Sequence, residues 1–388
     1  MTQSSIRSLL FAATFLGFNS LAAQQKVDPG KSAAVAAGEA DQVLLDMIVG
    51  SNGGLIEKPF SKGQHKHVRA EFSRYFAAKY GDKLRANLGN DAAPLYQFLD
   101  ANAELRDTLF TAIDPLEDNP ATVMAVFRDL WKSNPDAVKA NDELAVAIAV
   151  VWDNPRGVYD YRPHQMRTKS ILPDGVAKVG ALDNFLFLLD RRAKLKGPQQ
   201  QLPWEFLIHT VNHRTPIEER DWAIAAYQKR RNGIGSIYKE VEYDKLMLQT
   251  KSEVCKLGGK PYTLENIREF GGVCAMQADF SARVAKSLLV PAEYVGGESN
   301  TGVRHAWIMW AEVKSVQKEA VTFSLESYGR YFGDKFYVGT LRDPKSGKEM
   351  TDRELERRLT AVGTAPWSAR QADLLMRAYP LVCETKQF

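Results

Sequence analysis

Apolar side chains recur at intervals of three and four residues through much of the first half of the chain. Val68, Phe72 and Phe76, for example, fall on one side of a helix at this spacing. The same pattern predicts helices over residues 34–49, 67–80, 94–110, 121–131, 137–152 and 181–196. These segments have similar lengths but share no motif, so we expect a helical array without a repeat family.

The helical pattern is interrupted twice. Residues 154–180 are rich in proline and glycine, which predicts a loop with short extended pieces. Residues 197–201 form a polar Gly-Pro-Gln-Gln-Gln break, and a chain of 388 residues is long for one ordinary core. We therefore expect a mainly helical N-terminal domain over residues 24–200 and a second domain over residues 201–388.

The second half mixes helix and strand patterns. Small and apolar side chains at helical spacing predict a helix that starts at Cys274, with Gln277 and Asp279 on its exposed or flanking side. Short apolar segments then predict an antiparallel meander over residues 292–295, 305–313 and 321–326. The predicted fold class is α+β, with the cysteine-bearing helix packed on an antiparallel sheet.

Two further helices are predicted near the C-terminus. Thr351 and Glu354 form a capping box ahead of apolar residues at helical spacing. Residues 369–381 form a second amphipathic segment that ends near Cys383. We expect both helices to pack against the second domain.

The first residues have the features of a secretory signal peptide. Arg7 precedes residues 9–21, which are mostly apolar but too short and too interrupted to span a bilayer. Small residues at positions 20 and 22 fit cleavage after Ala22, or one residue later after Ala23. We therefore expect residues 1–23 to be removed and the protein to be secreted or periplasmic; the alternative is an uncleaved anchor helix.

Composition and charge add two exclusions. The chain is 45% hydrophobic and 25% charged, which is typical of globular proteins, and no other stretch of 18 apolar residues follows. We therefore expect no stable membrane anchor after signal removal. A net charge of +4 is small for this length and gives no argument for a nucleic-acid partner.

Three cysteines leave one unpaired in an oxidising compartment. We expect Cys255 to pair with Cys383, which leaves Cys274 as the free thiol. All three could instead be unpaired. A Cys255–Cys274 disulfide is the remaining alternative, and it would exclude a nucleophilic role for Cys274.

Cys274 and His305 have the chemistry and the order of a nucleophile and its base. Cys274 follows two glycines at a predicted helix start, where backbone N–H groups and the helix dipole favour a thiolate and could hold an oxyanion. His305 opens a predicted strand and could take the thiol proton. Glu326 ends the following strand, where a meander could bring it next to His305 as the group that orients the imidazole.

Residues 204–330 resemble the transglutaminase-like superfamily, a papain-like fold of thiol enzymes. The resemblance depends on four motifs in order and a matching lead-in to the cysteine, namely Gly-Val-Cys at 272–274, Val-Pro-Ala at 290–292, His-Ala-Trp at 305–307, Leu-Glu at 325–326 and Tyr-Thr-Leu-Glu-Asn at 262–266. It implies a triad of Cys274, His305 and an acidic residue. That residue is usually aspartate in the family, whereas Glu326 stands here, and Asp343 is a competitor.

The resemblance implies an enzyme that acts on amide or peptide bonds through an acyl-enzyme, with water or an amine as the acceptor. A protein or peptide is then the expected substrate, and no cofactor is implied. The alternative is an inactive binding or scaffold protein that keeps the fold.

His209 and His213 are spaced four residues apart, a spacing that can bind a metal on a helix. The segment lacks the glutamate of a metalloprotease motif, and no third ligand is evident. We therefore expect no metal site.

Overall fold

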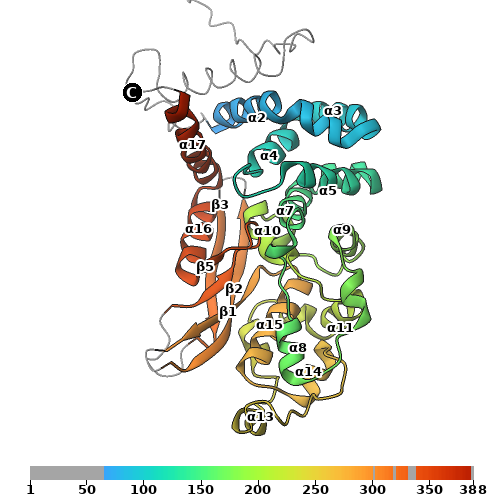
Figure 1. Cartoon of the computed structure of the whole chain (residues 1–388), viewed down its shortest axis with the longest axis vertical. Helices are drawn as coiled ribbons and strands as arrows, with labels where there is room; N and C mark the ends of the chain where they lie inside the picture. The colour runs from blue at the N-terminus through green and yellow to red at the C-terminus, as the bar shows by residue number, and fades with distance from the viewer. Residues whose placement is uncertain (1–64, 300–301, 318–319, 331–337, 386–388) are drawn as a thin grey trace, which may run out of the picture.

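A computed structural model describes residues 65–299, 302–317, 320–330 and 338–385, with side chains up to residue 377 in the last segment (Figure 1). The expected signal peptide at residues 1–23 and the predicted helix at 34–49 lie outside the described residues. The side chain of Cys383 also lies outside the described part of the structure.

Helices occupy most of residues 65–190. The apolar spacing predicted most of them, but the helix Arg162–Thr168 lies within residues 154–180, where we expected a loop with short extended pieces. The helices are α2 (His65–Leu88), α3 (Ala92–Ala101), α4 (Ala103–Ala112), α5 (Pro120–Ser133), α6 (Pro135–Ala140), α7 (Asp142–Trp152), α8 (Arg162–Thr168) and α9 (Ala181–Asp190). The predicted helix at 94–110 is divided at Asn102, whose backbone leaves the helical region. Asn134 caps α6 through its side chain, which accepts a hydrogen bond from the Ala137 N–H and explains the break before Pro135.

The next part of the chain is also mainly helical. Its helices are α10 (Trp204–Val211), α11 (Ile217–Tyr227), α12 (Gly235–Tyr238), α13 (Lys245–Gln249), α14 (Leu264–Phe270) and α15 (Cys274–Ser287). Short 3₁₀ helices lie at Gly89–Asp91, Pro155–Gly157, Asp174–Lys178, Pro198–Gln201 and Gln228–Arg230.

An antiparallel five-stranded sheet follows, so the fold class is α+β. The strands are β1 (Ala292–Glu298), β2 (Arg304–Gln317), β3 (Ala320–Tyr328), β4 (Thr340–Arg342) and β5 (Glu349–Thr351), in the order β3-β2-β1-β4-β5. The register places Ile308 of β2 between Tyr294 of β1 and Tyr328 of β3. The three predicted strands are therefore confirmed, and β4 and β5 extend the sheet beyond β1.

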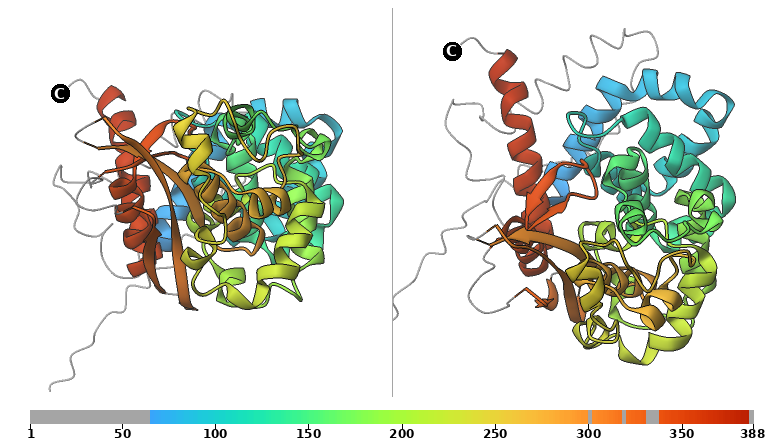
Figure 2. Two further views of the ribbon diagram at one scale, coloured as in Figure 1. Left: turned by 90° about the horizontal axis from the view of Figure 1, so that it is seen from below. Right: turned by 60° about the horizontal axis from the view of Figure 1, so that its bottom comes forward.

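Helices cover both faces of the sheet. α15 packs on β1 and β2, whereas α16 (Asp352–Thr364) packs on β3 and continues into α17 (Pro366–Thr385). Figure 1 shows the sheet, α16 and α17 along one side of the molecule, and Figure 2 shows the same arrangement from two other directions. Thr351 caps α16 by accepting a hydrogen bond from the Glu354 N–H at 3.1 Å, as the capping pattern predicted.

α15 is buried on all sides, so Gln277 and Asp279 do not lie on an exposed side as expected. Asp279 accepts hydrogen bonds from the hydroxyls of Tyr159 and Tyr262, at 2.8 and 3.0 Å. Further along α15, buried Arg283 and Lys286 form ion pairs with Glu219 (2.6 Å) and Glu293 (3.2 Å), respectively. These partners come from distant segments, and they satisfy polar groups that burial would otherwise leave without compensation.

One continuous cluster of buried apolar side chains extends from Phe76 in α2 to Val362 in α16. The expected boundary near residue 200 therefore falls inside a shared core. Arg370 of α17 joins the two parts directly, because it forms ion pairs with Glu143 and Glu205 at 2.7 and 2.6 Å. Among the described residues, no helix is long and apolar enough to cross a membrane.

Candidate active site

Cys274 is the first residue of α15, after a backbone turn that only glycine fits. Gly271 has φ +78°, and a Cβ there would lie 2.4 Å from the Glu242 carbonyl oxygen. Gly272 donates to the same carbonyl at 2.9 Å and accepts from the Asp244 N–H at 3.0 Å. The two glycines thus hold the helix start against residues 242–244.

The sulfur of Cys274 lies beside the peptide that joins His305 to Ala306, because it accepts a hydrogen bond from the Ala306 N–H. Burial raises the pKa of the Cys274 thiol above its ordinary value of 9.0. The N–H groups of Ala306 and Ala275 and the charge of Arg167 oppose this rise without cancelling it. The resting group is therefore a protonated thiol, and not the thiolate expected from the helix position alone.

His305 is half-buried near the start of β2 and is held by a backbone carbonyl. Its Nε2 lies 2.6 Å from the Gly329 carbonyl oxygen. A carbonyl only accepts, so Nε2 carries the proton and Nδ1 is the basic nitrogen of the neutral ring. Burial lowers the pKa of His305 below 6.5, although the Gly329 carbonyl opposes this, so the imidazole is neutral at pH 7.

Glu326 is not brought to His305. It pairs with Trp310, five residues further along β2, which is roughly 17 Å away at about 3.3 Å per residue. Directly opposed residues share a sheet face and side chains alternate along a strand, so Glu326 and His305 point to opposite faces. The expected Cys-His-Glu arrangement is not formed, because the position opposite His305 falls beyond the end of β3.

Asp343, the competitor for the third position, is engaged elsewhere. It follows β4, which lies on the far side of β1 from His305. Its carboxylate accepts from Arg358 at 2.8 Å and from the Lys345 N–H at 2.9 Å. Its pKa stays below the ordinary value: burial raises it, but these hydrogen bonds and the Arg358 charge outweigh burial. Neither predicted carboxylate orients His305, and the Gly329 carbonyl contacts the ring instead.

Three tyrosines surround the thiol, from α12 (Tyr238), from the segment before α13 (Tyr243) and from β1 (Tyr294). Tyr238 donates to the Ala306 carbonyl at 2.9 Å, which fixes β2 at this point. Tyr243 forms a β-bridge with Gly272. Tyrosines from three separate segments therefore lie close enough to Cys274 for its charge to act on their hydroxyls.

The helical first half also contributes to this region. The His164 ring of α8 lies 4.9 Å from the Tyr294 ring, and Tyr159 lies 5.9 Å from Tyr294. These three side chains line a cavity of about 890 Å³ that extends along β1 to Arg342. No pattern in residues 154–180 predicted these contacts, because these residues lack an apolar period that would indicate what they pack against.

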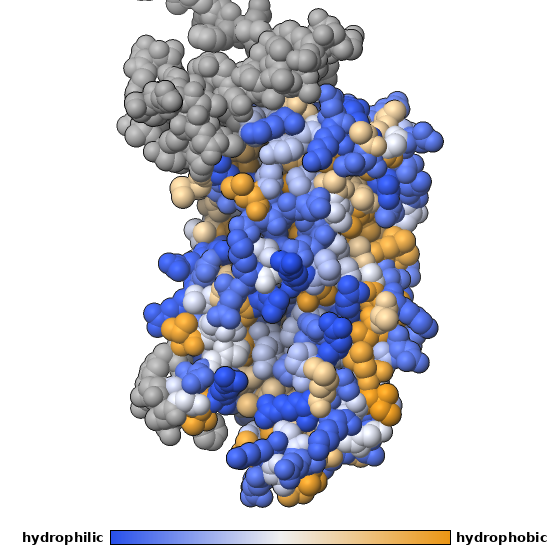
Figure 3. Space-filling view, viewed as in Figure 1, coloured by the Kyte–Doolittle hydropathy of each residue, from blue (hydrophilic) through white to orange (hydrophobic). Residues whose placement is uncertain are grey.

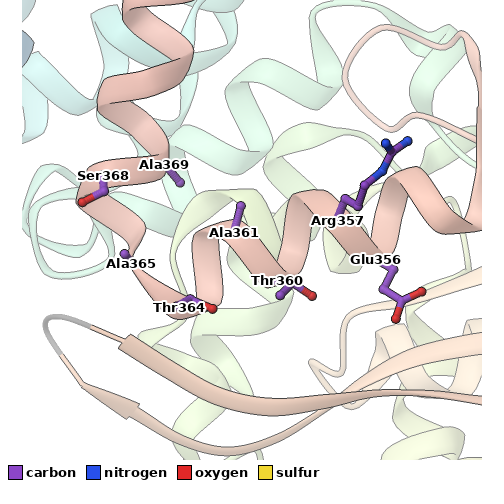
Figure 4. Close-up of a pocket in the computed structure, with 8 residues that line it drawn as sticks. All are labelled: Glu356, Arg357, Thr360, Ala361, Thr364, Ala365, Ser368 and Ala369. Atoms are coloured by element: carbon purple, nitrogen blue, oxygen red, sulfur yellow. The ribbon is translucent and has the colours of Figure 1, made fainter. Parts of the chain in front are cut away.

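Neither Cys274 nor His305 is among the residues that line this cavity. The groove where α16 meets α17 is lined mainly by small side chains, and neither Cys274 nor His305 is among its lining residues (Figure 4). The face seen in Figure 3 is mainly hydrophilic, with scattered apolar side chains.

His209 and His213 are each hydrogen-bonded to a neighbouring side chain inside the protein. Both are buried: His209 Nδ1 lies 2.7 Å from Glu293, and His213 Nδ1 lies 2.9 Å from the Thr215 hydroxyl. No group of three or more potential metal ligands occurs among the described residues.

Cys255 and Cys274 both carry free thiols. The Cys255–Cys274 disulfide that would exclude a nucleophile is therefore not formed. The expected disulfide between Cys255 and Cys383 is not formed either, because Cys255 is a free thiol. The odd number of cysteines therefore did not show which of them are paired. Comparisons with protein-family models, curated proteins and solved structures find no match.

Proposed function

We propose that the protein is an exported, transglutaminase-like cysteine enzyme that acts on amide or peptide bonds. The observation that carries the proposal is the position of the Cys274 sulfur, which accepts a hydrogen bond from the peptide N–H that follows His305, while the His305 ring is held by the Gly329 carbonyl. A thiol at a helix start and a neutral imidazole on the neighbouring strand residue supply the two groups that nucleophilic catalysis uses. The motif resemblance in residues 204–330 points to the same chemistry.

In the proposed reaction, the sulfur of Cys274 attacks the carbonyl carbon while its proton moves to Nδ1 of His305. The backbone N–H groups at the start of α15 hold the oxyanion of the tetrahedral intermediate. The imidazolium then returns the proton to the leaving nitrogen, the C–N bond breaks, and a thioester remains on Cys274. Water or a second amine attacks the thioester, with His305 again taking the proton, and the free thiol is restored.

The Gly329 carbonyl accepts a hydrogen bond from Nε2 of His305. It fixes the ring orientation and the Nε2–H tautomer, but it adds no negative charge to stabilise the imidazolium. The proposed enzyme therefore works from a neutral thiol–imidazole pair, with proton transfer coupled to attack on the carbonyl.

An inactive binding protein is the second candidate. The raised thiol pKa and the position of Glu326 on the opposite sheet face favour it. This protein would bind a peptide near the same tyrosines without breaking a bond.

A thiol-directed activity probe separates the two candidates. A peptidyl vinyl sulfone is expected to label the wild-type protein and the Cys255→Ala control but not Cys274→Ala. Labelling that survives Cys274→Ala, or that is equal in wild type and His305→Ala, would end the enzyme proposal. For an active protein, the product masses with and without an added amine distinguish hydrolysis from acyl transfer.

A further inference from the structure

The cavity of about 890 Å³ lies where β4 separates from β1. The two strands pair at Gly296 and Thr340. If this ladder continued, Tyr294 would pair with Arg342, but among the described residues that pair is not formed. Both residues line the cavity instead. The cavity is therefore a gap in the sheet with one strand on each side.

The backbone of β1 faces this gap at Tyr294. At one end of the strand the Ala311 N–H donates to the Pro291 carbonyl at 2.8 Å. At the other end the Ser299 N–H donates to the Val303 carbonyl at 2.9 Å, so the odd-numbered residues of β1 bond to β2. Successive residues of a strand point their backbone groups to opposite sides. The N–H and C=O of Tyr294 therefore point away from β2, and neither has a backbone partner in the described chain.

The backbone of β4 faces the same gap at Arg342. The Asp343 N–H donates to the Lys348 carbonyl at 2.8 Å, so the odd-numbered residues here bond to β5. The N–H and C=O of Arg342 therefore point toward β1. Unpaired backbone groups of this kind accept an added strand. An extended peptide in the gap would bond to Tyr294 on one side and to Arg342 on the other.

The cavity wall also carries arginines that are available to a ligand. Arg156, Arg214 and Arg342 line it, and no carboxylate in the described ranges lies within ion-pair distance of any of the three. Arg156 and Arg342 are exposed. Arg214 is held by the Val179 carbonyl, to which Nη1 donates at 2.7 Å, and its guanidinium lies 4.9 Å from the centre of the Trp152 ring. The remaining N–H groups of Arg214 can bind a ligand.

Most of the carboxylates that line the cavity are already paired. Asp160 lies 2.7 Å from Arg162, and Glu293 lies 3.2 Å from Lys286. Glu349 is the remaining acidic residue of the lining, so three free arginines face one free carboxylate. The cavity is therefore complementary to a negatively charged ligand.

We propose that this cavity binds an extended, acidic segment of a polypeptide, which adds as a strand between β1 and β4. The backbone of the segment pairs with both strands, and its carboxylates bind the arginines, whose paired N–H donors match the two oxygens of a carboxylate. Neither Cys274 nor His305 lines the cavity, so the inference does not rest on the proposed function.

Defined peptides test the inference on the Cys274→Ala protein, which cannot consume them by the proposed reaction. The probe is a short fluorescent peptide of alternating threonine and glutamate with both ends capped. One matched peptide has glutamine in place of each glutamate, and another carries N-methyl groups on alternate residues, which remove backbone donors. Fluorescence polarisation is expected to show at least about threefold weaker binding for each matched peptide. Equal binding of either one, or no binding of the acidic peptide, would overturn the proposal.

Two arginines of the same cavity provide a matched pair of variants. Arg342→Gln is expected to weaken binding of the acidic peptide by about 3- to 10-fold and to leave the glutamine peptide within about twofold. Arg162→Gln is expected to stay within about twofold for both peptides, because Asp160 already pairs with that charge. An equal loss in the two variants, or no loss in Arg342→Gln, would contradict the assignment of the charge.

Amide hydrogen exchange locates the bound peptide. The acidic peptide at saturation is expected to slow exchange at the amides of Tyr294 and Arg342, whose N–H groups gain partners. Protection confined to other segments would overturn the proposal. Failure of the enzyme proposal shows separately, as vinyl sulfone labelling that does not depend on Cys274 or His305, and it would leave the peptide binding unchanged.

Discussion

At the scale of single residues, Cys274 begins α15 and His305 lies near the start of β2, the strand on which α15 packs. This packing places the Cys274 sulfur beside the peptide that follows His305. Glu326 was a reasonable expectation for the orienting group, since it ends the next strand. Its register with Trp310 depends on where the β2–β3 hairpin turns, which the alternation of apolar residues does not fix.

The position of Glu326 gives a direct mutational prediction. Glu326→Gln is expected to keep activity within about twofold, because its side chain lies on the opposite sheet face from His305. His305→Ala is expected to lose at least about 100-fold, the usual minimum contribution of a positioned base. Turnover of a peptide amide measures both, and a large loss in Glu326→Gln would contradict the register.

The raised thiol pKa gives a prediction about pH. The rate of Cys274 alkylation by iodoacetamide should rise with pH through 9.0 and reach its midpoint above that value, because burial disfavours the thiolate. Below the midpoint the rate should grow about tenfold per pH unit. A midpoint near or below pH 7 would indicate a thiolate–imidazolium pair and would contradict the neutral resting state.

At the scale of elements, periodicity found the helices and the main strands, but it misjudged the environment of α15. A polar side in a helix normally faces solvent, so Gln277 and Asp279 were expected near the surface. The structure buries them because their partners come from distant segments: Asp279 accepts from Tyr159 and Tyr262, and the Gln277 amide donates to the Val241 carbonyl at 2.8 Å. Such pairings between distant segments have no local signal in the sequence.

The buried pair Lys286–Glu293 tests how strongly α15 depends on these contacts. Glu293→Gln leaves the Lys286 ammonium without its carboxylate in a buried site. We expect a loss of about 3–5 kcal/mol in the free energy of unfolding. Urea denaturation measures this loss. Adding Lys286→Met to Glu293→Gln is expected to recover part of it. If Glu293→Gln alone is as stable as the wild type, the ion pair does not stabilise the helix.

At the scale of the whole molecule, the helical first half and the sheet share one core and several ion pairs. The apolar pattern predicted both parts, but not their contact surface. The contacts include the turn between β4 and β5, where Lys345 reaches Asp118 at 3.1 Å and the Ala112 carbonyl at 2.6 Å. The first half also supplies Tyr159 and His164, whose rings lie 5.9 and 4.9 Å from the Tyr294 ring of β1.

Asp153 reports on this contact region through pH. Burial, opposed by the Asn119 N–H, raises the pKa of Asp153 to about 7 from 3.8. The carboxyl loses its proton near pH 3.8 in the unfolded chain and only near pH 7 in the folded protein. The free energy of unfolding therefore falls as the pH rises between these two values. The loss is complete above pH 7. Between pH 4 and 7, the free energy of unfolding of the wild type is expected to fall by about 1–3 kcal/mol more than that of Asp153→Asn, as measured by denaturant unfolding. Parallel pH dependences would contradict the shift.

The most direct test of the central claim is to detect an acyl group on Cys274. The protein is incubated with a mixture of peptides, quenched in acid and digested for mass spectrometry. We expect an acyl adduct on Cys274 that hydroxylamine removes, no adduct in Cys274→Ala, and at least about 100-fold slower formation in His305→Ala. An adduct on another residue, or no adduct when the same peptides bind, would contradict the account.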